Sequence, residues 1–129
     1  MVKTLKLTFA CLFLAVAISP AAEDPSADHV KWMKALGAQN GAIRKGADVA
    51  KNAAEMTETM KSVAAFWDAR HSETATKANK SIMAGAAAIA KAGDDKDALM
   101  AGMKMVGGGC KGCHDAHREK ISDTEYKIK

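Results

Sequence analysis

Five consecutive residues near the C-terminus, Cys110-Lys111-Gly112-Cys113-His114, constrain this chain more than any other feature. A C-x-x-C-H run is typical of covalent haem c attachment, in which two thiols add to the porphyrin vinyl groups and the histidine supplies an axial nitrogen to the iron. Positions i, i+3 and i+4 share one face of a helix, so Cys110, Cys113 and His114 can meet one flat ligand. The sequence therefore predicts one haem c, with two thioether cysteines and His114 as the proximal iron ligand.

Two other interpretations compete for the same residues. A C-x-x-C pair can be a redox dithiol, but such a pair usually follows a strand, and no strand pattern precedes this one. A zinc site would use Cys110, Cys113, His114 and His117. Ligands so close together on one helix converge poorly on a tetrahedron, and zinc fingers place their histidine pair on a separate element. The haem interpretation is therefore favoured over both.

Residues 1–22 have the pattern of a cleaved secretory signal peptide, with two lysines, an apolar stretch over 7–18 and a small-residue exit. The apolar stretch is too short to anchor the chain in a bilayer. Cleavage would remove Cys11 and leave both remaining cysteines in the haem motif. The sequence thus predicts a single domain over residues 23–129 that is exported to the periplasm and is not membrane-anchored after cleavage.

The charge balance and the motifs exclude several functions. The net charge is +4, and removal of the two signal-peptide lysines leaves the mature chain near +2. Two haem propionates would bring that value close to neutrality, so the basic balance does not indicate nucleic-acid binding. The chain shows neither a glycine-rich phosphate loop nor a plausible Ser/His/Asp set. We therefore expect a haem protein that is not an enzyme.

The apolar residues recur at helical spacing in four segments, and Ala, Lys and Met favour helix. The segments run over about 26–45, 49–67, 72–92 and from 95 toward 120, where either Asp94 or Asp95 caps the last one. The predicted buried faces contain Val30, Met33 and Gly37; Val49, Ala53, Met56, Met60, Val63 and Trp67; Ala75, Ala78, Ile82, Gly85 and Ile89; and Leu99, Met103 and Val106, followed by the two haem cysteines. Short links indicate an all-α, antiparallel four-helix bundle with the haem attached near the C-terminus. The polar tail beyond about residue 120 is expected to be frayed.

The three glycines Gly107-Gly108-Gly109 just before the haem motif allow two interpretations. Each glycine in a helix interior costs about 1 kcal/mol relative to alanine, which favours a break with a new turn starting at Cys110. A bare backbone would alternatively let the porphyrin or a neighbouring helix come close. Both interpretations stay open at the level of the sequence.

With the helices and the motif placed, the chain resembles the class II cytochromes c, the family of cytochrome c′ and cytochrome c-556. Residues 110–118, Cys-Lys-Gly-Cys-His-Asp-Ala-His-Arg, are similar to the family pattern C-x-x-C-H-x-x-F-R. Residues 33–38, Met-Lys-Ala-Leu-Gly-Ala, together with Gly41-Ala42-Ile43, are similar to its first helix. The resemblance implies a four-helix bundle with its haem motif close to the C-terminus.

The resemblance also bears on function through the second axial position of the iron. Met33 falls where the c-556 type has its distal methionine, which implies a low-spin, one-electron carrier that exchanges electrons with periplasmic redox proteins. The c′ type instead leaves this face open and binds nitric oxide or carbon monoxide, in which case Met33 would be part of the pocket wall. Family members often form homodimers, and a homodimer is possible here.

Two histidines depart from the family pattern. His29 stands where the family often has an arginine near a haem propionate; it can pair with a propionate, lie in solvent or replace Met33 on the iron. His117 stands where the family usually has an aromatic residue, and we expect it to pack beside the haem. Phe66 and Trp67 are expected to belong to the core.

Overall fold

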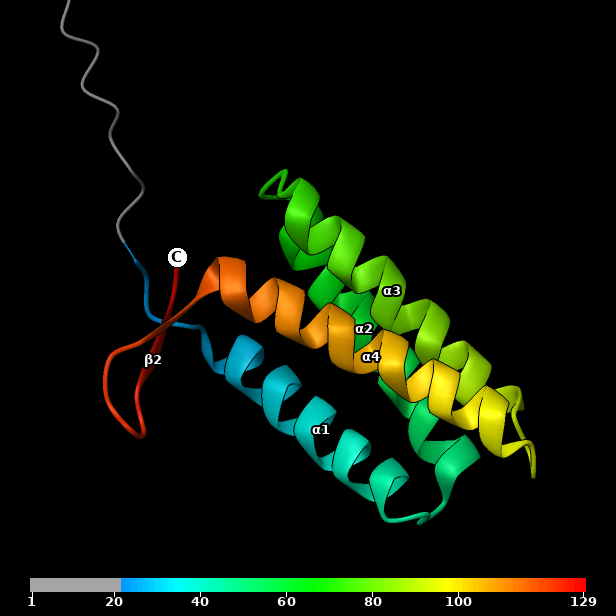
Figure 1. The fold of residues 1–129 in the computed structure, drawn as a ribbon. Coiled ribbons are helices and arrows are strands. Elements are labelled where there is room, and N and C mark those ends of the chain that lie inside the picture. The colour runs from blue at the N-terminus through cyan, green and yellow to red at the C-terminus, as the bar shows by residue number, and fades with distance from the viewer. Residues whose placement is uncertain (1–21) are drawn as a thin grey trace, which may run out of the picture.

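The computed structural model describes residues 22–129, which form four helices followed by a small hairpin (Figure 1). The elements are α1 (Ala27–Arg44), α2 (Val49–Asp68), α3 (Glu73–Lys91), α4 (Lys96–His117), β1 (Arg118–Lys120) and β2 (Tyr126–Ile128). The predicted four helices are confirmed, and the first three end within a residue of their expected bounds. The predicted signal peptide lies outside the described residues, apart from Ala22. Among the residues described, none of the helices has the length and hydropathy needed to cross a membrane.

Three of the four helices begin at a side-chain cap. Ser26, Ser72 and Asp95 each accept a hydrogen bond from the backbone N–H three residues further on. Such a cap satisfies a donor that has no partner within the helix and contributes about 1 kcal/mol. The choice left open by the sequence for the fourth helix is thus settled in favour of Asp95.

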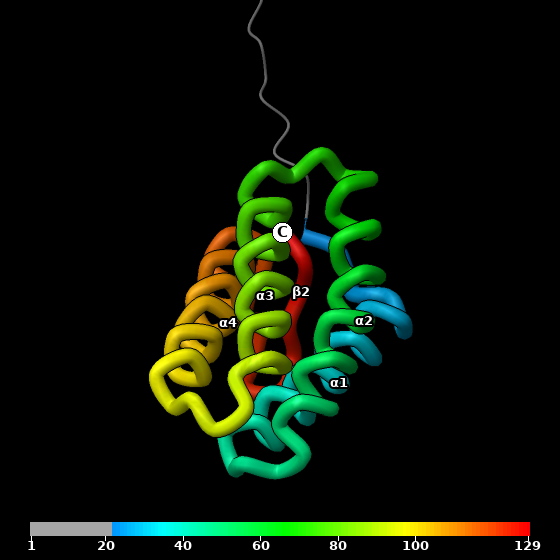
Figure 2. The backbone as a smooth tube through the Cα atoms, turned by 90° about the vertical axis from the view of Figure 1, so that its right-hand side faces the viewer, coloured from blue at the N-terminus to red at the C-terminus, as the bar shows by residue number. Residues whose placement is uncertain are grey.

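The helices pack in sequence order, α1 on α2, α2 on α3 and α3 on α4, with α1 and α2 on one side and α3 and α4 on the other (Figure 2). The core contains the buried residues predicted for the second and third helices, except that Val49 is only half-buried, together with Val106 of α4 and Ile43 of α1. These are Ala53, Met56, Met60, Val63, Trp67, Ala75, Ala78, Ile82, Gly85 and Ile89. The helical periodicity therefore located the buried faces of α2 and α3 correctly.

Glycines line the interface between α3 and α4 and let the two backbones approach closely. A Cβ atom at Gly85 would lie 2.7 Å from the carbonyl oxygen of Gly102, and one at Gly109 would lie 2.8 Å from the carbonyl oxygen of Ala78. Gly109 thus permits close approach of α3, as one interpretation of the triple glycine predicted. The other interpretation, a helix break before Cys110, is wrong, because α4 continues through all three glycines to His117.

The C-terminal tail corrects a second expectation. Instead of fraying, it forms the antiparallel pair β1–β2, and its penultimate residue Ile128 is only 8% exposed. Ile128 also exchanges two backbone hydrogen bonds of 2.8 Å with Glu23, and the N–H of Lys129 donates to the carbonyl of His117. These bonds connect both ends of the described chain to the end of α4, and Figure 1 shows these segments lying close together. The polar composition of the tail therefore gave no indication that Ile128 is buried.

The first helix is the least enclosed. Of its predicted buried face, Met33 is half-buried, whereas Val30 is 36% exposed and Gly37 is exposed. The prediction of burial is therefore wrong for Val30 and Gly37. Helix α1 packs on α2 but forms no extended interface with α4, so its apolar face turns toward an open space between α1 and α4.

Candidate haem site

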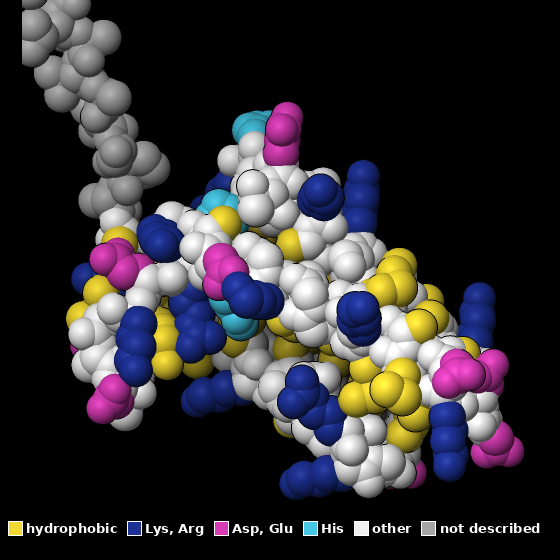
Figure 3. Space-filling model, viewed as in Figure 1, with side chains coloured by type: hydrophobic (Ala, Val, Ile, Leu, Met, Phe, Trp, Pro, Cys, Tyr) yellow, Lys and Arg dark blue, Asp and Glu magenta, His cyan; other side chains and the backbone are white. Residues whose placement is uncertain are grey.

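A cavity of about 780 Å³ lies between α1 and α4 and extends inward to α2 and α3. Figure 3 shows hydrophobic side chains at the bottom of the hollow between α1 and α4, with Lys and Arg side chains around it. Its inner walls include Met56, Met60, Val63, Trp67 and Ile82, and the hairpin closes one end. Ligand-binding cavities typically have such a volume and a mainly apolar lining with a few polar groups.

The α4 wall of this cavity carries the complete haem motif. Cys110, Cys113 and His114 all line the cavity and are half-buried. The two cysteines are free thiols, and burial raises the pKa of both, so they are protonated at neutral pH. The predicted helical face is thus confirmed, and it presents two thiols and an imidazole to one apolar space.

His114 is electrostatically suited to bind a metal. Burial, and next the positive charge of Arg118, lower the pKa of His114, so its imidazole is neutral at pH 7 and keeps a nitrogen lone pair. A guanidinium nitrogen of Arg118 lies 3.5 Å from His114 Nδ1. The guanidinium itself is stacked 3.8 Å from the centre of the Tyr126 ring, so the hairpin holds it in place.

The α1 wall carries Met33, the predicted distal ligand. Met33 is half-buried, lines the same cavity as the haem motif and packs against the hydrophobic core. The fold therefore brings together all four residues that the sequence singled out, three from α4 and one from α1. A thioether is one of the side chains that bind haem iron opposite a histidine.

His29 also lines the cavity, one helical turn before Met33. It is 8% exposed, its ring centre is 4.8 Å from that of Phe66, and its Nδ1 atom is buried without a protein partner. Burial, followed by the charge of Arg70 and of His114, lowers the pKa of His29. A neutral, buried imidazole excludes the interpretation that His29 lies in solvent; its roles toward a propionate or the iron stay predictions.

His117 connects the end of α4 to three other parts of the chain through its ring contacts. Its ring stacks on Trp67 with centres 4.2 Å apart, Nε2 lies 2.7 Å from the Ser72 hydroxyl, and Nδ1 lies 2.9 Å from the Lys129 carbonyl. A carbonyl can only accept, so Nδ1 carries the proton and Nε2 accepts from Ser72. His117 therefore holds the cavity wall at Trp67, and Trp67 belongs to the core as predicted.

Asn79 was not among the residues that the sequence motifs indicated. This residue of α3 lines the cavity and is 2% exposed, yet neither atom of its carboxamide has a hydrogen-bond partner in the described chain. It lies one helical turn from both Ala75 and Ile82, on the buried face predicted for this helix. A polar asparagine on a face predicted to be buried is unusual, and the helical periodicity alone could have identified Asn79 as a candidate functional residue.

These residues fit a covalently bound haem. The cavity is apolar and supplies the two thiols, the imidazole and, across from them, the thioether; its buried polar atoms on His29 and Asn79 have no protein partner. Among residues 22–129, no three His, Cys, Asp or Glu side chains cluster closely enough to hold a metal ion. Haem iron takes at most two ligands from protein side chains, so the motif does not require such a cluster.

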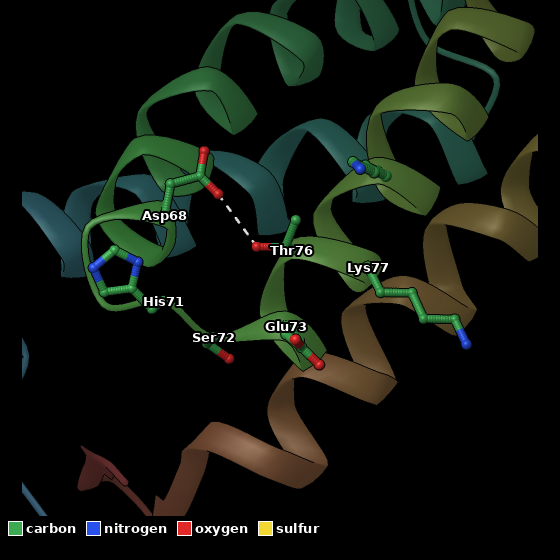
Figure 4. A pocket seen from close by; sticks show the side chains of 7 residues that line it. Asp68, His71, Ser72, Glu73, Thr76 and Lys77 are labelled. Atoms are coloured by element: carbon green, nitrogen blue, oxygen red, sulfur yellow. Dashed lines mark hydrogen bonds between the residues drawn. The ribbon is translucent and has the colours of Figure 1, made fainter.

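A second, shallow depression lies where α2 passes into α3 (Figure 4). Its side chains are mostly exposed and polar, and the Thr76 hydroxyl donates a 3.2 Å hydrogen bond to Asp68 across it. The bond ties the end of α2 to the start of α3. The residues of the haem motif are not among those that line this depression.

The chain was compared with protein-family models, with curated proteins and with solved structures, and none of them matches it.

Proposed function

We propose that the protein is a periplasmic c-type cytochrome of the class II kind that carries one electron. The observation that supports this most strongly is the convergence of Cys110, Cys113, His114 and Met33 on one apolar cavity, from helices that are far apart in the sequence. The two cysteines would hold haem c through thioether bonds, and His114 and Met33 would bind its iron. When bound, the haem supplies the site that accepts and gives up the electron.

The side chains of this chain would set how readily the electron is exchanged. The apolar walls exclude water, and the axial pair, the buried surroundings and nearby charges determine the reduction potential of a haem. Arg118, placed 3.5 Å from His114 Nδ1, disfavours additional positive charge on that ring. The partners of the protein would be other periplasmic redox proteins, which it would contact through small transient interfaces.

The test is an absorption spectrum of protein exported to the periplasm, oxidised and reduced, with and without carbon monoxide. We expect a Soret band and low-spin bands, and we expect Met33→Ala to convert them to high-spin bands. Met83→Ala serves as the matched control, because Met83 packs against the core from α3 and is not among the cavity-lining residues.

Each alternative has its own spectral signature. A wild-type spectrum that is high-spin and shifts readily with carbon monoxide would identify a gas-binding cytochrome of the c′ type. Low-spin bands that survive Met33→Ala but are lost in His29→Ala would place His29 on the iron. A protein without a Soret band would refute the haem proposal.

A further inference from the structure

The buried amide of Asn79 is a polar feature of the cavity that the proposed function does not use. It is 2% exposed, and both Oδ1 and Nδ2 are buried without a protein partner. Leaving a buried donor or acceptor unsatisfied costs about 1 to 3 kcal/mol, and replacing it by an apolar group of the same shape is nearly neutral or stabilising. An asparagine here is therefore costly unless something in the cavity bonds to it.

The packing of α3 against α4 fixes where this amide lies. The two helices run antiparallel, with Ser72 against His117 at one end and Ala78 against Gly109 further along. Asn79 follows Ala78, and because the helices are antiparallel it lies level with Gly108 and Gly109, within one helical turn of Cys110; Asn79 and Cys110 both line the cavity. Under the proposed function, Cys110 would hold a vinyl side of the porphyrin, and the propionates leave the porphyrin on the opposite side.

The chemistry of the amide limits what can satisfy it. Nδ2 needs an acceptor and Oδ1 needs a donor. A carboxylate, a thioether sulfur and a diatomic gas can accept a hydrogen bond but cannot donate one, so each leaves Oδ1 unsatisfied. A water molecule does both, and buried water typically makes about three hydrogen bonds to groups of this kind.

We propose that Asn79 binds an ordered water molecule beside the haem and that this polar site lowers the reduction potential. The inference rests on the proposed function, because it places the water next to a bound haem. Oxidation adds a positive charge to the iron centre, and a polar neighbour stabilises that charged form over the reduced one. Asn79 would thus be a positioning residue that acts through the water.

The test combines the crystal structure of the haem-bound protein with potentials measured by spectroelectrochemistry. We expect a water within hydrogen-bond distance of Oδ1 and Nδ2 in the wild type, and a more positive potential in Asn79→Leu. Asn79→Ser, whose hydroxyl both donates and accepts, should bring the potential back toward the wild-type value. Met60→Leu is the control for repacking, since it changes the same cavity wall without changing its polarity.

The outcomes separate the inference from the proposed function. A haem-bound protein whose amide bonds to a propionate, or whose Asn79→Leu potential shifts no more than that of Met60→Leu, overturns the inference and leaves the cytochrome intact. A more positive potential of Asn79→Leu that Asn79→Ser largely reverses supports it, because leucine can hold no water whereas the serine hydroxyl can. A protein that takes up no haem refutes both.

Discussion

The three adjacent glycines before the haem motif provide an internal test of the packing. Gly108 and Gly109 follow one another in the same helix. A Cβ atom at Gly108 would nevertheless meet no heavy atom within 4 Å beyond the backbone of its own helix and its chain neighbours. A Cβ atom at Gly109 would lie 2.5 Å from Ile82 Cγ1 and 2.8 Å from the Ala78 carbonyl oxygen. We predict that Gly108→Ala stabilises the protein and that Gly109→Ala is the less stable of the two variants.

The magnitude follows from two opposing terms. Replacing a glycine in a helix interior by alanine contributes about 1 kcal/mol of stability, and this term is common to both variants. Forcing an extra carbon into a well-packed interface costs about 1 to 3 kcal/mol, and only Gly109→Ala incurs this cost. The difference between the variants is therefore about 1 to 3 kcal/mol, which for a domain of this size separates their melting temperatures by roughly 5 to 15 °C.

The assay is thermal and urea denaturation of the haem-bound variants, followed by circular dichroism at the helical band. Gly107→Ala is a second reference, because a Cβ atom there also meets nothing within 4 Å. Equal midpoints for Gly108→Ala and Gly109→Ala would refute the close approach of α4 to α3. They would also remove the register argument that places Asn79 within one helical turn of Cys110.

Three further predictions concern the histidines and the hairpin. Because burial lowers the pKa of His29, the unfolded chain takes up a proton near pH 6.5 that the folded one does not, so stability should fall as the pH drops from about 7 to 5. His29→Gln should flatten this dependence in urea titrations, whereas His71→Gln, at an exposed connector position, should not. Ile128→Ala should lower the free energy of unfolding by about 2 kcal/mol or more, and Ile121→Ala, 47% exposed, by much less. His117→Phe should cost about 1 to 3 kcal/mol in the same assay despite conserving the stack on the indole, since it removes two hydrogen bonds.

The parts of the fold that the sequence predicts well are those decided by local physics. The helix starts at Ser26 and Ser72 follow from capping, and the buried faces of α2 and α3 follow from the spacing of their apolar residues. Both signals lie within a single helix. No long-range contact has to be known in order to interpret them.

The errors come from contacts between distant residues. Ile128 is buried because it pairs with Glu23 at the other end of the described chain, which the polar composition of the tail does not indicate. The helix continues through Gly109 because α3 packs against its bare backbone, which offsets the intrinsic preference for a break. Tertiary packing overrides local propensity at both places.

The partial burial of α1 connects the fold to the proposed site. Val30, Met33 and Gly37 recur at helical spacing, and the same three residues line the cavity instead of packing against α4. An apolar helix face usually packs against protein, and here it faces a space whose opposite wall carries two thiols and an imidazole. The periodicity thus identified a face that needs an apolar partner. Under the proposed function this partner is a haem, and the buried amide of Asn79 is the reason to propose a water molecule beside it.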